Sequence, residues 1–315
     1  MRPTFITAAA IVAALLTLAG QAQAQANRTF VSGQGSDSNP CSLAAPCRSF
    51  AGALAQTNAG GEITILDPAG YGTVTINKAV SIVNDGVGEA GVTAASAVDA
   101  ITVSAGSNDV VNLRGLTLVG GGIGKNGVNF ISGFKLRIQN SVIRGFTGNG
   151  INSVTTGNFT GTLSVSDTIV SDNQLHGILI QPSGSQAESE VLLVRVQSIG
   201  NGFDGFFFNG GSATGTLSAL ATDSIASENG LQGFDVRSPA NQLALTVTLV
   251  NCKVSRNIST GVDTVGPNAK MFLSQTTIAG NANGFGADPG TMKSFGNNYI
   301  VDTANFGSLT SVATQ

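Results

Sequence analysis

Four stretches of this chain superpose without gaps: SDTIVSDNQLHGILI (166–180), VRVQSIGNGFDGFFF (194–208), TDSIASENGLQGFDV (222–236) and VNCKVSRNISTGVDT (250–264). Each contains an asparagine that is followed four residues later by a glycine. With a fifth copy, the asparagines are spaced by 28, 28, 28 and 24 residues: Asn173, Asn201, Asn229, Asn257 and Asn281. Self-similarity at such a period is typical of solenoid proteins, so the chain is expected to be built from stacked repeats.

Within each repeat, apolar and polar residues alternate with a period of two. For example, Leu163 and Val165 flank Ser164, and Val247 and Leu249 flank Thr248. Another apolar column lies three residues after the repeat glycine and contains Ile180, Phe208 and Val236. This alternation predicts short strands, and the Gly, Asn, Ser and Asp residues between them predict turns. A unit of 23–28 residues with two or three short strands has the size of one turn of a parallel β-helix. The five asparagines are then expected to stack as a structural ladder at one corner.

The N-terminal part of the chain resembles the opening of bacterial right-handed parallel β-helix proteins of the pectin-lyase-like superfamily. The matching residues are Gly35, Ser36, Asp37, Asn39 and Pro40, followed by Ile63, Ile65, Gly70 and Tyr71. The resemblance implies an all-β fold, a single-stranded right-handed parallel β-helix of about nine or ten coils with a short N-terminal capping helix near residues 47–57. We therefore divide the chain into an N-terminal cap (27–62), a β-helix (63–307) and a C-terminal tail (308–315).

Residues 1–26 have the layout of a secretory signal peptide. Arg2 precedes an apolar run over residues 8–19, and small residues flank the expected cleavage sites at residues 22–26. The run is shorter than the ~20 residues needed to span a membrane, so a secreted or periplasmic protein without a membrane span is expected. In such an oxidising compartment Cys41 and Cys47 are expected to form a disulfide bond, whereas Cys252 is expected to be buried.

The composition excludes several classes of protein. Of 315 residues, 42 are glycine, hydrophobic residues make up 42% and charged residues 10%, which is too apolar for a disordered chain. The formal net charge of −3 argues against a nucleic-acid-binding protein, which would need a strongly basic surface. The oligomeric state stays open.

The resemblance leaves the activity open, because this scaffold carries lyases, hydrolases, epimerases and adhesins. The sequence lacks an Asp-Asp pair, an Asn-Thr-Asp motif and any Trp, which the polysaccharide-cleaving groups use. Arg237-Ser238-Pro239 begins an Arg-x-Pro-x-x-Arg motif, but Gln242 occupies the place of the second arginine. The sequence therefore favours a non-catalytic secreted protein that binds a polysaccharide or a cell-surface glycan. The alternative is a carbohydrate-active enzyme, a lyase or hydrolase of an acidic polysaccharide.

The repeat register predicts one cluster of functional side chains near the asparagine corner. Asp235 and Asp263 share one outward position on successive turns, and His176 and Asp204 share another. If the cluster is a site, these four are the candidate catalytic residues, and Phe207, Glu228 and Arg256 are candidate binding residues. Stacked carboxylates repel one another unless a proton or calcium lies between them, so calcium is an open alternative although no metal ligand set is assigned. The competing interpretation is a solvated charged face that keeps the sheet soluble.

Overall fold

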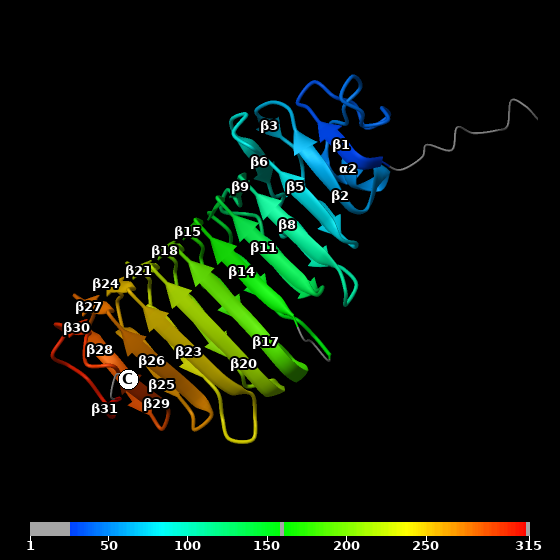
Figure 1. The fold of residues 1–315 in the computed structure, drawn as a ribbon. Helices are drawn as coiled ribbons and strands as arrows, with labels where there is room; N and C mark the ends of the chain where they lie inside the picture. The colour runs from blue at the N-terminus through cyan, green and yellow to red at the C-terminus, as the bar shows by residue number, and fades with distance from the viewer. Residues whose placement is uncertain (1–25, 158–160, 313–315) are drawn as a thin grey trace, which may run out of the picture.

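The computed structural model describes residues 26–157 and 161–312, which form an elongated stack of about ten turns (Figure 1). Along most of the stack, each turn contributes one strand to each of three parallel sheets, and the turns at the two ends are incomplete. The predicted signal peptide lies outside the described residues, except for Ala26, which begins the first strand. No helix in the described part of the chain is long and apolar enough to cross a membrane.

The first sheet has twelve strands, and its order follows the sequence. Its members are β1 (Ala26–Val31), β2 (Thr57–Ile65), β5 (Val80–Val83), β8 (Val110–Arg114), β11 (Lys135–Gln139), β14 (Thr162–Ser166), β17 (Gly184–Val194), β20 (Ala213–Thr222), β23 (Ala244–Val250), β26 (Ala269–Ser274), β29 (Thr291–Ser294) and β31 (Leu309–Ser311). Because β31 pairs with β29, this sheet continues into the segment that we expected to be a tail.

The second and third sheets complete each turn. The ten-stranded sheet contains β3 (Ala69–Gly70), β6 (Ala90–Thr93), β9 (Leu116–Val119), β12 (Val142–Arg144), β15 (Ile169–Ser171), β18 (Gln197–Ile199), β21 (Ile225–Ser227), β24 (Lys253–Ser255), β27 (Thr277–Ala279) and β30 (Tyr299–Ile300). The nine-stranded sheet contains β4 (Val74–Ile76), β7 (Ile101–Ser104), β10 (Val128–Ser132), β13 (Ile151–Ser153), β16 (Ile178–Ile180), β19 (Phe206–Asn209), β22 (Phe234–Arg237), β25 (Thr260–Val265) and β28 (Asn283–Asp288).

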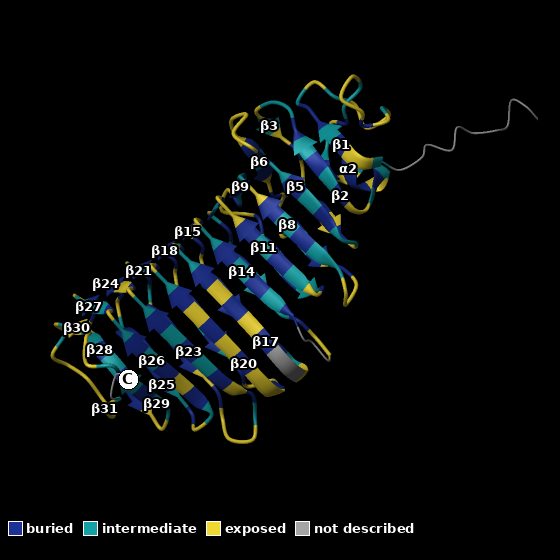
Figure 2. Cartoon of the chain, in the orientation of Figure 1, coloured by how far each residue is buried: buried dark blue, intermediate teal, exposed yellow. Residues whose placement is uncertain are grey.

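The interior is filled by the apolar columns of the repeat. Phe206 and Phe234, for example, are fully buried on successive turns, and their rings stack with centroids 4.4 Å apart. The buried and exposed residues alternate along the long strands, as Figure 2 shows for β20 and β23. This alternation follows from the opposite directions of successive side chains in a strand.

The five repeat asparagines form a continuous ladder at the corner between the ten-stranded and nine-stranded sheets. Each side-chain Nδ2 donates to the Oδ1 of the next asparagine over 2.9–3.0 Å, from Asn173 to Asn281. The last amide, that of Asn281, donates to Asp302 Oδ2 over 2.8 Å. An aspartate thus ends the ladder, because its carboxylate accepts hydrogen bonds and needs no further acceptor above it.

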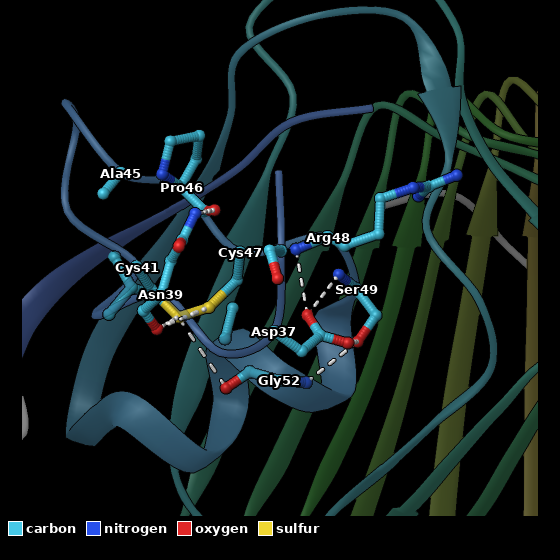
Figure 3. The surroundings of a disulfide bond; sticks show 12 residues. Asp37, Asn39, Cys41, Ala45, Pro46, Cys47, Arg48, Ser49 and Gly52 are labelled. Atoms are coloured by element: carbon cyan, nitrogen blue, oxygen red, sulfur yellow. Dashed lines mark hydrogen bonds between the residues drawn. A yellow bond between two sulfur atoms is a disulfide. The ribbon is translucent and has the colours of Figure 1, made fainter. Parts of the chain in front are cut away.

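The N-terminal cap is held by the Cys41–Cys47 disulfide and by Asp37 (Figure 3). The Oδ1 atom of Asp37 accepts hydrogen bonds from the backbone amides of Arg48 and Ser49, both over 2.9 Å. Ser49 is the N-cap of the single helix among the described residues, α2 (Phe50–Gln56), where its hydroxyl accepts from the Gly52 amide. The helix is therefore shorter than the expected 47–57, since Cys47 pairs with Val31 in an isolated bridge.

Candidate functional site

The repeat register places the predicted carboxylates on one face of the nine-stranded sheet. Asp235 of β22 pairs with Asp263 of β25, and Phe207 of β19 pairs with Asp235. The expectation of a solvated face is wrong for these carboxylates, because Asp235, Asp263 and Asp204 are 0%, 4% and 2% exposed. We call the group the carboxylate cluster; its members are His176, Asp204, Gln232, Asp235, Arg237 and Asp263.

Arg237 covers Asp235, which explains the burial. Its Nε lies 3.0 Å from Asp235 Oδ1, and its Nη2 lies 2.7 Å from Oδ2. The guanidinium also stacks on the Phe207 ring at 5.6 Å from the ring centroid. Burial raises the pKa of Asp235 to about 7 although Arg237 opposes the shift, and burial also raises the pKa of Asp263.

His176 and Asp204 meet on the same face, two turns and one turn before Asp235. His176 Nδ1 lies 3.0 Å from Asp204 Oδ2, closer than its 3.4 Å approach to the Asp204 amide, which favours the tautomer that donates Nδ1–H to the carboxylate. The imidazole is flanked by the rings of Phe207 and Phe203, with centroids 4.8 Å and 5.4 Å away. The imidazole is thus fixed between one carboxylate and two aromatic rings.

His176 and Asp204 also belong to a second polar ladder, which the sequence analysis did not predict. In three of its steps, the side-chain oxygen preceding the repeat glycine accepts from the backbone amide one turn later: Asn126 from Asn149, Asn149 from His176, and Asp204 from Gln232, over 2.8–3.0 Å. A polar residue before each glycine was the signal that could have revealed it. His176 and Asp204 therefore have a structural role in joining the turns, whatever else they do.

Glu228 and Arg256 do not join the carboxylate cluster. They form an exposed ion pair with 3.2 Å between Arg256 Nη1 and Glu228 Oε1, and both have left-handed backbone conformations at the turn before the asparagine ladder. No ion pair or hydrogen bond in the described part of the chain connects either residue with Asp235 or Asp263. The structure thus separates these two predicted binding residues from the predicted catalytic ones.

The described residues contain no group of three or more His, Cys, Asp or Glu side chains arranged to hold a metal ion. Within the carboxylate cluster, two buried oxygens have no hydrogen-bond partner: Gln232 Oε1 and Asp263 Oδ1. The cluster can bind or release protons, but its burial leaves only the Arg237 side chain, 44% exposed, and the edge of His176 open to solvent.

A groove that our sequence analysis did not predict crosses the outer face of the twelve-stranded sheet. It has a volume of about 580 Å³ and crosses β11, β14, β17, β20 and β23, roughly 19 Å at the usual strand spacing. Leu192 and Leu220 form a half-exposed apolar floor, and Lys135, Arg137 and Glu190 provide charges. This volume is within the range of small-molecule binding sites.

Two columns of the register extend the groove with further cations. Arg137, Leu192, Leu220 and Lys293 lie in one column, and Lys135, Glu190 and Lys270 lie in the neighbouring column. Among the described side chains, none of these four cations has a carboxylate within ion-pair distance, whereas Arg28, Arg114, Arg195, Arg237 and Arg256 all do. This face is therefore open to an anionic ligand on a chain whose net charge is negative.

Comparison with solved structures identifies the architecture. The chain superposes on a pectate lyase, Pel9A, with a TM-score of 0.59 and 14% identity over 92% of this chain and 79% of that one. It superposes on a rhamnogalacturonan lyase with a TM-score of 0.52 and 10% identity over 91% of this chain and 86% of the other. The chain has the right-handed parallel β-helix fold of pectin-lyase-like proteins. No protein-family model and no curated protein matches the sequence of this β-helix.

Proposed function

We propose that this β-helix is a secreted carbohydrate-active enzyme, a lyase that binds an acidic polysaccharide in the groove of the twelve-stranded sheet. The observation that carries the proposal is the groove itself, an apolar floor with Lys135 and Arg137 beside it and no carboxylate paired with either among the described side chains. The two solved structures compared above are named as lyases, which supports the catalytic alternative better than the non-catalytic one.

The charges in the groove suit elimination better than hydrolysis. In a lyase reaction, a base removes the proton next to the uronate carboxylate, the C4–O bond breaks, and a C4–C5 double bond forms. Lys135 and Arg137 would bind the uronate carboxylate and stabilise the charge that develops on it. Glu190 lies two turns from Lys135 in the same column, about 10 Å away, and is the candidate base. Hydrolysis uses a pair of carboxylates, and Glu190 is the only one among the groove-lining residues that the structure describes.

The test is incubation with pectin, alginate and glycosaminoglycans, with and without calcium, followed by ultraviolet absorbance of unsaturated products and by a reducing-end assay. We expect unsaturated products from one uronate polymer, their loss in Glu190→Gln with binding retained, and loss of binding in Lys135→Ala/Arg137→Ala. Lys253→Ala is the matched control, because Lys253 is exposed on the ten-stranded sheet. Reducing ends without unsaturation would indicate a hydrolase, and binding without turnover a non-catalytic glycan-binding protein.

A further inference from the structure

Two buried oxygen atoms of the carboxylate cluster lack a hydrogen-bond donor. Gln232 Oε1 and Asp263 Oδ1 can only accept hydrogen bonds and have no partner, although Gln232 is only 9% exposed and Asp263 only 4%. A buried acceptor without a donor loses the hydrogen bonds that water gave it and destabilises the fold. The two side chains lie close together, and donation from the Gln232 amide nitrogen to the carboxyl group lowers the pKa of Asp263. That contact leaves the two unpartnered oxygens without a donor, and one proton between them would satisfy both.

The charges of the cluster are also unbalanced. It contains the carboxyl groups of Asp204, Asp235 and Asp263 but a single guanidinium, that of Arg237. Arg237 binds Asp235 through two nitrogens, and His176 contacts Asp204. Asp263 receives neither ion pair, so it is the carboxyl group whose negative charge is least compensated.

We propose that Asp263 is held as the neutral carboxylic acid and that its O–H donates to Gln232 Oε1. This proton makes the packing of the last turns against the carboxylate cluster depend on pH. One proton supplies the donor for Gln232 and removes the uncompensated charge. The direction of the titration agrees, since burial raises the pKa of Asp263 with help from the Asp204 carboxylate, and outweighs Arg237 and the hydrogen bonds of the Thr264 backbone and the Gln232 side chain, which lower it.

The C-terminal segment is the element that this proton would hold. A Cβ atom at Gly286 would collide with both Asp263 Oδ1 and Phe306 Cζ, so the carboxyl group, β28 and the Phe306 ring meet at this glycine. Phe306 is fixed there by backbone hydrogen bonds with Phe285 and Ala287 over 3.2 Å and 3.1 Å. The charged and titratable groups facing Asp263 are Asp204, Asp235 and Arg237; β28 presents Gly286 and the C-terminal segment presents Phe306. Ionisation would place a negative charge against an aromatic ring, which is unfavourable.

The sign of the effect follows from the raised pKa. The folded state keeps the proton to a higher pH than the unfolded state, in which the carboxyl group titrates near 3.8. The stabilisation is complete below that value, declines as the pH rises toward the folded-state pKa, and is gone above it. The last turns are therefore packed more stably against the carboxylate cluster in acid than in alkali, and this effect does not depend on any polysaccharide.

The test compares thermal melting between pH 4.5 and 9 for the parent, Asp263→Asn and Asp223→Asn. The side-chain amide that Asp263→Asn introduces would imitate the neutral acid and donate to Gln232. We expect the parent to lose roughly 5 °C or more from low to high pH, Asp263→Asn to show a flatter profile, and the exposed control Asp223→Asn to follow the parent. We also expect the carboxylic-acid C=O band in the infrared spectrum at pH 6 to be stronger in the native parent than in Asp263→Asn, where Asp235, with a pKa of about 7, accounts for the remaining band.

Equal pH profiles for the parent and Asp263→Asn, or acid bands of equal strength in the two proteins, would overturn the proposal. Calcium chloride is added in a parallel series at pH 8. If calcium raises the melting temperature of the parent but not of Asp263→Asn, the two oxygens bind a cation, and the proposal of a proton is wrong. If Asp263→Asn fails to fold, Asp235→Asn is measured instead: an acid band at pH 6 in that variant supports a neutral Asp263, and its absence overturns the proposal.

Discussion

Replacing Asn229 by alanine removes four side-chain hydrogen bonds from the middle of the asparagine ladder. Asn229 Oδ1 accepts from the backbone amide and from Nδ2 of Asn201, over 3.1 Å and 3.0 Å. Its Nδ2 donates to the Ser198 carbonyl and to Asn257 Oδ1, over 3.1 Å and 2.9 Å. The side chain is completely buried, so water cannot replace these bonds in the folded state.

At about 1 kcal/mol for each hydrogen bond, the loss amounts to roughly 4 kcal/mol of unfolding free energy. In this variant, the neighbouring ladder residues Asn201 and Asn257 keep some of their hydrogen bonds. Asn257 Oδ1 still accepts from the backbone amide of residue 229, and Asn201 Nδ2 still donates to the Val170 carbonyl and the Ser198 hydroxyl. The Asn201 backbone amide is left without its acceptor, which is the most costly single consequence. A loss of this size is a large part of the ~5–15 kcal/mol that stabilises a typical domain.

Urea unfolding, followed by circular dichroism, measures the difference between the parent and Asn229→Ala. Because a long repeat array can unfold in parts, hydrogen exchange of the Asn201 and Asn257 amides is measured as well. Asn77→Ala is the control, since Asn77 is exposed and makes no side-chain hydrogen bond within the described residues. If Asn229→Ala costs no more than Asn77→Ala, the ladder does not stabilise the stack and our reasoning is wrong.

Three further predictions concern single positions. Gln275 is exposed with a φ of 51°, so Gln275→Gly should raise the unfolding free energy by about 1 kcal/mol in the same urea titration, and a decrease would contradict a purely conformational effect. The double variant Cys41→Ser/Cys47→Ser should lower it by about 2 kcal/mol, because the disulfide closes a short loop; an unchanged midpoint would count against this. Burial raises the pKa of the Cys252 thiol to about 11, so iodoacetamide at pH 8 should label Cys252 in the denatured chain only, and rapid labelling of the folded chain would place the thiol at the surface.

Much of the candidate site could be predicted from the repeat register. The 28-residue spacing pairs Phe207 with Asp235 and Asp235 with Asp263, as the strand pairing of β19, β22 and β25 shows. The repeat register does not predict whether an outward side chain is buried. Burial there depends on whether long side chains nearby fold over the outer face of the strand. Arg237 lies two residues beyond Asp235, and its side chain folds back over that carboxylate.

The groove could not be predicted in the same way. Lys135 and Arg137 are more than 130 residues from Lys270 and Lys293, and the intervening turns differ in length. The columns that join them become visible only once each strand of the twelve-stranded sheet is paired with the next. Glu190 was not singled out, because a lone charged residue within a strand has no distinguishing pattern in the sequence.

The sequence by itself determined the β-helix, its period, the asparagine ladder and the alignment of residues on successive turns. It did so because stacking repeats one strand spacing apart turns a fixed interval in sequence into a fixed contact in space. The tertiary structure alone decided which outward side chains are buried, where two acceptor oxygens lack a donor, and which cations face an open groove. These properties depend on how side chains from several turns cover one another, and a sequence interval does not encode that coverage.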